Sequence, residues 1–490
     1  MQENTEDLMD LVSYGIKCCE NKGVEYADVK FMDTQMEDIS FKNDSLERMS
    51  VTNKRGIGFR CLVSKSWGFA SSNELTRDKV NELADKVVKI AKASALVKKF
   101  DIEFADEPIH EAKVKTPVKT DPFDVELKQK IDVLQESAKR AKEHSELIKF
   151  ATSHFVSRKD HMVLHTTEGT KIDQTIIWCG GGVASTAIEG GEVQTRSLPA
   201  SFRGDFQTKG YEYFESLNLL DVTEEAAKEA VQLLSAKKMP SGKSTMILGH
   251  SQLALQVHES CGHPTELDRA IGYEAAYAGT SFLTPDLLGT GFKYGNELVT
   301  MVADATVSGG LGTFFYDHEG VEAQRTVMVD KGIFMAFMSS RETAKAIGLE
   351  RSSGAARAMG YDRIPIIRMT NVNLESGDWE FDELIEDTKD GYFLDTNRSW
   401  SIDDIRMNFQ FGTEIGWRIE NGEMTEMIKN PTYEGITPEF WGNVSGICSN
   451  KHWKIFGTPN CGKGEPGQAA YVGHGIAPTR FDNVRIGILK

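Results

Sequence analysis

Two long stretches of strand-like alternation, each bordered by helical patterns, constrain the fold of this chain most strongly. Across residues 24–69 apolar and polar side chains alternate, as at Ala27, Val29 and Phe31, and turn-forming residues separate the runs. A second strand-like stretch covers residues 148–204. Apolar residues recur at helical spacing beside these stretches, over residues 8–19, 76–91, 127–134 and 222–238. This order of elements predicts an α+β fold.

The length of 490 residues exceeds what one compact core accommodates, and we expect three segments. Residues 1–105 form an N-terminal α+β domain, of α/β sandwich-like type, and residues 124–238 form a middle α+β segment packed with it. The proline-containing stretch 101–124 is the candidate linker. Residues 239–490 are rich in glycine and strand patterns. They predict a mainly antiparallel or barrel-like domain, with one short motif helix lying against it.

The amino-acid composition limits which binding partners and which cellular compartment we expect. The net charge of -17 is spread along the chain, which disfavours nucleic acid as a partner because a phosphate backbone needs a basic face. The first ten residues carry no basic and apolar leader, and the longest apolar runs are far shorter than a bilayer span. We therefore expect a cytoplasmic protein without membrane contact. The 7 scattered cysteines do not suggest a disulfide framework.

The segment after the buried strand pattern at residues 244–248 carries the most chemistry. It reads His258-Glu259-Ser-Cys-Gly-His263-Pro264, which is one residue longer than the His-Glu-x-x-His pattern of zinc peptidases. Side chains five positions apart point about 140° apart on a regular α-helix, so both imidazoles reach one ion only if the helix loosens. A π-bulge or an early helix end achieves this. Gly262 tolerates unusual dihedrals and Pro264 disfavours helical geometry at His263, so we expect the release there.

Two neutral imidazoles suit one zinc ion per chain, and a catalytic zinc site needs a third protein ligand and an open position for water. Glu259, adjacent to the first histidine, is the candidate general base. The candidates for the third ligand are Cys461, Cys448, Cys261, Glu266, Asp268 and His474. Cys461 stands in a Gly-rich loop beside Lys463, which favours a thiolate. A buried structural thiol is the alternative for Cys461, and Cys261 is expected to point away from the metal.

Three blocks of sequence together resemble the TldD/PmbA family of metallopeptidases, on the TldD side. They are His258–Ala270, Met301–Val327 with its VADATVSGGLGTFFYDHEG run, and Cys461–Gln468. The likeness is strong in the C-terminal half, and the N-terminal half agrees only in the order of its elements. Pro264 and the pair Glu465-Pro466 depart from the usual pattern, which affects the expected loop geometry and leaves the proposed ligands unchanged.

The resemblance implies a zinc site formed by His258, His263 and Cys461, with Glu259 in the catalytic position. It also implies a peptidase that cuts unfolded or short peptides and works as a dimer. Its partner is a PmbA-type (TldE-like) chain, which lacks the metal motif, or a second copy. Because this chain has all four residues, it resembles the catalytic member.

Other interpretations fit parts of the sequence. A non-catalytic peptide-binding or regulatory subunit of a peptidase complex is the main alternative, although a structural zinc site needs no adjacent base. Residues 241–245 end like a nucleotide-binding loop, but Lys237 stands where that loop requires glycine. Tyr316 or His318 is a candidate donor to an oxyanion, and an exposed hairpin turn is the alternative for that segment.

Overall fold

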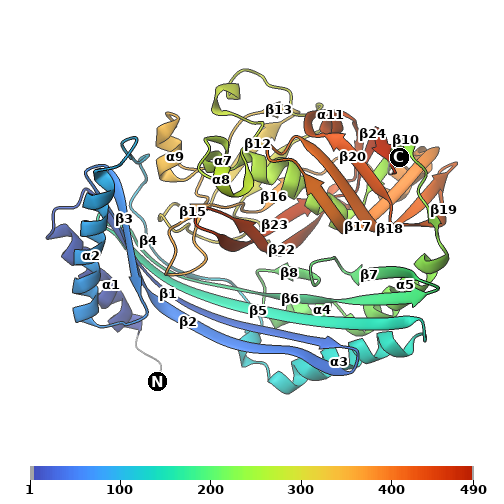
Figure 1. Cartoon of the computed structure of the whole chain (residues 1–490), viewed down its shortest axis with the longest axis horizontal. Helices are drawn as coiled ribbons and strands as arrows, with labels where there is room; N and C mark the ends of the chain where they lie inside the picture. The colour runs from blue at the N-terminus through green and yellow to red at the C-terminus, as the bar shows by residue number, and fades with distance from the viewer. Residues whose placement is uncertain (1–4, 488–490) are drawn as a thin grey trace.

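The computed structural model describes residues 5–487, and Figure 1 shows a long curved sheet with the C-terminal half of the chain above it. The sheet has the strand order β3-β2-β1-β5-β6-β4, and β7 and β8 also pair with β6. All of these pairings are antiparallel except that of β4 with β6. The strands are β1 (Tyr26–Lys42), β2 (Ser45–Val63), β3 (Ser66–Ser72), β4 (Glu111–Lys115), β5 (Ile148–Thr166), β6 (Lys171–Glu189), β7 (Glu192–Leu198) and β8 (Asp205–Gln207).

Helices cover this sheet at its two ends. The helices α1 (Thr5–Glu20) and α2 (Arg77–Ala95) share one apolar cluster with β1 and β2. The helix α2 begins where the Thr76 side chain accepts a hydrogen bond from the Lys79 N–H, as expected for an N-cap. At the other end lie α3, α4 and α5, with a short 3₁₀ turn, η1, before them. Their bounds are η1 (Pro122–Asp124), α3 (Leu127–Glu143), α4 (Tyr211–Ser216) and α5 (Leu219–Ser235).

The first and middle segments of the chain therefore contribute strands to the same sheet. The stretch 101–124, expected to be a linker, contains the edge strand β4. Its alternating exposed and half-buried residues carry little apolar signal, which is why the sequence pattern did not identify it as a strand.

The C-terminal half contains strands whose pairings close into a ring, in agreement with the expected barrel-like and mainly antiparallel domain. The order β17-β10-β24-β20-β18 is closed by pairing between β17 and β18. The short strands β9, β19 and β21 attach to this ring. The bounds are β9 (Lys237–Lys238), β10 (Gly242–Leu248), β17 (Asp390–Ile402), β18 (Asn408–Glu420), β19 (Glu423–Lys429), β20 (Thr432–Ile436), β21 (Val444–Ile447) and β24 (Thr479–Ile486). The α+β fold is thus confirmed.

Smaller elements complete this half and carry the segments around the motif. Three small sheets are formed by β13-β12-β11-β16, β14-β15 and β22-β23. These strands are β11 (Met301–Asp304), β12 (Arg325–Asp330), β13 (Ile333–Phe334), β14 (Ala356–Arg357), β15 (Ile366–Ile367), β16 (Val372–Leu374), β22 (Lys454–Lys463) and β23 (Gln468–Ile476). The sequence indicated only the motif helix here, and the structure adds short helices: α7 (Leu267–Ala270), α8 (Ala275–Ala278), α9 (Arg341–Ala346), α10 (Phe381–Asp387), α11 (Thr437–Gly442), η4 (Pro285–Leu287) and η5 (Asn450–His452).

Buried polar contacts attach the two halves to each other. The Arg60 guanidinium on β2 lies 3.0 Å from the Glu319 carboxylate, and both side chains are buried. At the opposite end of the sheet, the Ser197 N–H donates to Glu414 over 2.7 Å. Within residues 5–487, none of the helices combines the length and the apolar character needed to cross a membrane.

Candidate functional site

The motif helix loosens as predicted, but it widens already at His258 rather than at Gly262, where the sequence placed the change. The α-helix α6 (His250–Val257) continues into a π-helical turn, η2 (His258–Gly262), and then a 3₁₀ turn, η3 (His263–Thr265). The N–H of His263 donates to the carbonyl of His258, which is the five-residue bond of a π turn. Such a turn contains more residues than an α turn, so positions five apart approach the same side of the helix. Of the two expected mechanisms, the structure contains the π-bulge.

The expected release of His263 from helical geometry is wrong. Its backbone has φ -62° and ψ -45°, and Gly262 has φ -57° and ψ -63°, so both residues are helical. The wider turn alone brings the rings together, and Pro264 begins the following 3₁₀ turn. Gly262 instead leaves space for Met369, because a Cβ there would lie 2.3 Å from the Met369 sulfur and would displace that side chain.

Three potential ligand atoms converge beside this turn. The Cys461 Sγ lies 3.4 Å from Nε2 of His258 and 3.8 Å from Nε2 of His263. All three ligand atoms lie within 4.8 Å of one another, and each of the three residues is 5% exposed. Cys461 is positioned by β22, near the hairpin turn to β23, rather than in an irregular loop as the glycines suggested.

The ionisation of these groups suits metal binding. Burial lowers the pKa of His258 and lowers that of His263 still more, so both imidazoles are neutral near pH 7. Burial raises the pKa of the Cys461 thiol. The Arg368 guanidinium and His263 lower it by a larger amount, so the pKa lies below the ordinary value. Lys463 was expected to stabilise this thiolate. Its Nζ instead contacts Asp268 at 2.5 Å and Glu266 at 3.4 Å, and Arg368 is the cation that acts on the sulfur.

Each histidine is oriented through its second ring nitrogen. Nδ1 of His258 lies 2.8 Å from Nε2 of His474, whose own Nδ1 lies 3.1 Å from the Val372 carbonyl. Nδ1 of His263 lies 2.9 Å from the Glu266 carboxylate. Two residues considered as third ligands, His474 and Glu266, thus hold the two histidines in place. Such partners fix the orientation and tautomer of a metal-binding imidazole.

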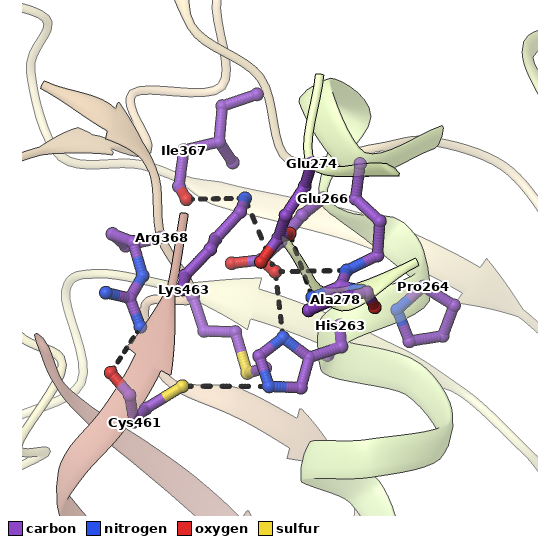
Figure 2. A network of polar contacts seen from close by, with 12 residues as sticks. His263, Pro264, Glu266, Glu274, Ala278, Ile367, Arg368, Cys461 and Lys463 are labelled. Carbon is purple, nitrogen blue, oxygen red and sulfur yellow. Dashed lines mark hydrogen bonds and ion pairs between the residues drawn. The ribbon is translucent and has the colours of Figure 1, made fainter. Parts of the chain in front are cut away.

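A buried network of charges surrounds Glu266 and joins the motif to the cysteine strand. Figure 2 shows Glu266 between His263 and Lys463, with Glu274 next to it. The Arg269 guanidinium lies 2.9 Å from Glu274, which also accepts a hydrogen bond from the Gly464 N–H. Arg368 donates to the Cys461 carbonyl over 2.6 Å. These contacts fix β22 against the π turn, so the cysteine and the histidines keep their relative positions.

Glu259 lies next to the first histidine and is 6% exposed. Its Oε2 accepts a hydrogen bond from Nη1 of Arg406 over 2.9 Å. Arg406 stands in the turn between β17 and β18, where Asp403 binds the N–H groups of Met407 and Asn408. Among residues 5–487 no hydrogen bond to Oε1 of Glu259 is present, so that oxygen remains available to a water or a substrate.

The remaining candidates have other roles. Cys261 packs in the large apolar core of the C-terminal half, as expected of a side chain pointing away, and Cys448 belongs to a separate apolar cluster. The segment around Tyr316 and His318 is not an exposed turn. Asp317 within it is fully buried and accepts backbone N–H groups, and His318 lies beside Lys30 of the long sheet.

Comparison with known proteins identifies the family. Residues 27–91 match domain 1, residues 120–234 the central domain and residues 241–488 the C-terminal domain of the PmbA/TldA metallopeptidases. The chain is also 31% identical over 451 residues to metalloprotease MJ0996 of Methanocaldococcus jannaschii, which covers 92% of this chain and 94% of the relative. The chain belongs to the PmbA/TldA metallopeptidase family. It is thereby a member of a peptidase family.

Two further PmbA/TldA relatives show the range of the family. A zinc metalloprotease TldD homolog of Saccharolobus solfataricus is 24% identical, with 96% of this chain and 98% of the relative covered. The crystal structure of TldE from Thermococcus kodakarensis has a TM-score of 0.73 at 16% identity, covering 98% of this chain and 100% of that one. The likeness to TldE shows that the described residues share the fold of that protein.

Proposed function

We propose that this chain is a zinc-dependent peptidase that hydrolyses unfolded or short peptides. The observation that carries the proposal is a buried set of two imidazole nitrogens and one thiol sulfur next to a carboxylate, within a chain of a metallopeptidase family. His258, His263 and Cys461 would hold one zinc ion. Atoms bound to one tetrahedral zinc lie about 3.5 Å apart, given Zn–N distances near 2.0 Å and Zn–S near 2.3 Å. The two sulfur–nitrogen distances of 3.4 and 3.8 Å fit that requirement, and all three atoms lie within 4.8 Å of one another.

When bound, zinc supplies a Lewis acid that activates water for attack on a peptide carbonyl. The chain itself supplies the proton transfers. Glu259 accepts a proton from the attacking water on Oε1 and later delivers it to the leaving amine. Arg406 holds Oε2 and so fixes the direction of the carboxylate. His474 and Glu266 keep the two imidazoles in the tautomers that leave Nε2 for the metal.

The burial of the site and an open strand edge favour extended substrates. The three proposed ligands are nearly inaccessible, so a folded loop cannot reach them. The strand β22, which carries Cys461, pairs with β23 alone among the strands of the described residues; Arg368 binds its Cys461 carbonyl and Asp205 its Gly457 N–H, and the rest of its outer edge has no strand partner. An extended peptide can add to such an edge through its backbone, whereas a folded protein has its backbone already paired.

The test has two parts: zinc analysis of the purified full-length chain, and digestion of one substrate sequence both as an unfolded peptide and within a folded domain. We expect about one zinc per chain, cleavage of the sequence as an unfolded peptide, and no cleavage when it is part of a stable folded domain. A chelator should stop cleavage and added zinc should restore it. Full zinc content without any cleavage would contradict the catalytic assignment and favour a non-catalytic peptide-binding subunit.

A second expectation concerns Glu266. The change Glu266→Gln should weaken zinc binding by about 10–100-fold, because the carboxylate no longer orients His263. Competition against a chromophoric chelator measures this. The matched control is Glu274→Gln, which alters a buried carboxylate of the same network that contacts neither histidine. An equal loss in both variants would mean that the network acts through folding rather than through His263.

A further inference from the structure

Two small cavities, the junction cavities, lie where the C-terminal half faces the long sheet. His318, Arg357 and Tyr471 line both of them, so the two cavities are adjacent. Met32 of β1 and Met162 of β5 also line the second one. Each cavity has a volume of about 20 Å³. Since one water needs about 10–15 Å³, each has room for a single small molecule or ion.

Arg357 on β14 is 7% exposed and forms no ion pair with a carboxylate of the described residues. Its Nη2 donates to the carbonyls of Met369 and Tyr471, and its Nε is buried without a partner. Burial lowers the pKa of Arg357 to about 10, so the guanidinium is still charged near pH 7. A buried charge without an opposite charge is unfavourable, and its presence beside a cavity favours an anion as ligand.

The surroundings of His318 add positive charge and a hydrogen-bond donor. Nδ1 of His318 accepts the N–H of Ala358 over 3.0 Å, so Nε2 carries the proton of the neutral ring. Nζ of Lys30 lies 3.3 Å from the same Nδ1. Lys30 is 3% exposed and has no carboxylate at ion-pair distance within residues 5–487. Burial and the charges of Lys30 and Arg357 lower the pKa of His318 well below its ordinary value, so the ring stays neutral.

The acids nearest to these groups are already neutralised. They comprise the one acid that lines the junction cavities and the two whose charges act on Lys30. Asp160 pairs with Arg158, Asp28 with Arg60, and Asp362 with Lys54. The oxygens of Asp160 also accept the hydroxyls of Thr34 and Tyr471. Among the residues that the structure describes, Arg357 and Lys30 are therefore left without an anion of their own.

A route connects the junction cavities with the solvent. The second junction cavity shares Ile176, Thr313 and Phe314 with a larger cavity of about 750 Å³. Pro117 and Lys119 in the lining of the larger cavity are exposed, so it opens at the surface. A small ion can thus reach Arg357 without unfolding of the chain.

We propose that the junction cavities bind one halide ion, chloride by its size, between the Arg357 guanidinium and the His318 ring. A monatomic anion fits a cavity of this volume, whereas sulfate, phosphate and acetate are too large. Lys30 on β1 and Arg357 in the C-terminal half then share one counter-ion. The ion therefore stabilises the contact between the two halves, and this role does not depend on peptidase activity.

The first test is thermal unfolding of the full-length chain in potassium chloride and in potassium gluconate at equal ionic strength. A chelator is present throughout, so that chloride on the proposed zinc plays no part. Chloride should raise the unfolding temperature by about 2–5 °C in a saturable way, because it binds the folded chain. Potassium acetate tests a carboxylate as the ligand and should act like gluconate. Equal stabilisation by acetate and chloride would overturn the assignment to a halide.

Two variants connect this effect to the site. Arg357→Met should abolish the response to chloride, and Lys30→Met should raise the chloride concentration at half of the shift by about tenfold. In gluconate, Lys30→Met should unfold at the wild-type temperature or above, because an unpaired buried charge is gone. A structural role of Lys30 alone predicts the opposite, a lower unfolding temperature with an unchanged chloride response.

The matched control is Arg196→Met. Arg196 is 4% exposed, like Arg357 a buried guanidinium, but it pairs with Glu229 at the other end of the long sheet. This variant should unfold at a lower temperature in both salts and keep the wild-type response to chloride. A loss of that response would show that the effect is general and would overturn the proposed site.

Bromide locates the ion directly. In crystals of the full-length chain grown with bromide in place of chloride, the anomalous signal should show a peak between Arg357 and His318. Lys30→Met should lower the occupancy of that peak, so the test remains decisive even if Arg357→Met fails to fold. The proposal is overturned if the wild type has no peak there at saturating bromide. It is equally overturned if Lys30→Met and the wild type respond identically to chloride.

Discussion

The change Glu259→Gln is expected to lower kcat for peptide hydrolysis by about 10³-fold while zinc content stays unchanged. Glu259 is the only group for which we propose both proton transfers, and an amide cannot accept the proton. The amide oxygen can still accept the hydrogen bond of Arg406, so the side chain should keep its place. Steady-state kinetics on an unfolded peptide and metal analysis of the same sample measure the two quantities.

The matched control for this variant is Glu414→Gln. Glu414 is 4% exposed, comparable to Glu259 at 6%, but it binds Ser197 at the junction with the long sheet. It should retain kcat even if the variant unfolds at a lower temperature. A Glu259→Gln enzyme that keeps more than a tenth of the wild-type kcat would show that another group accepts the proton.

The fold class and the position of the helices followed from periodicity, because long amphipathic helices and alternating strands leave strong patterns. The helix expected after Thr76 is α2, with the predicted cap. The strands missed were short or weakly patterned, such as β4 in the stretch expected to be a linker. The short helices after the motif also lacked a pattern. Their positions depend on tertiary contacts, and a helix of four to seven residues has no repeated apolar face.

For the candidate site, spacing indicated which residues the fold brings together but not how. The argument that His258 and His263 need a loosened helix follows from helical geometry alone, and the structure contains the π turn. The reason for Gly262 is its close approach to Met369, more than 100 positions later, which no local pattern reveals. The same applies to Arg368 and Arg406, the cations beside Cys461 and Glu259, and nothing in their local sequence distinguishes them from surface arginines.

The change His263→Ala should remove nearly all of the zinc and, with it, the stabilisation that the ion gives to the folded chain. Two remaining ligands are fewer than the three that a catalytic zinc site requires. If zinc is present at about 1,000 times its dissociation constant, its loss costs about 4 kcal/mol. Adding a chelator to the wild type should therefore lower the unfolding temperature of the C-terminal half by roughly 10 °C. The His263→Ala chain should unfold at the same temperature with and without the chelator.

The control His165→Ala distinguishes the stability lost with the metal from the stability lost by removing a buried imidazole ring. His165 is 3% exposed in the long sheet and contacts Ser13, far along the chain from the proposed ligands. Its variant should lose some stability yet bind zinc and respond to the chelator as the wild type does. A His263→Ala chain that still binds one zinc tightly would contradict the proposed ligand set. Since the peptidase proposal depends on Nε2 of His258 and of His263 meeting at one ion, that single result would also remove the basis for assigning Glu259 as the general base.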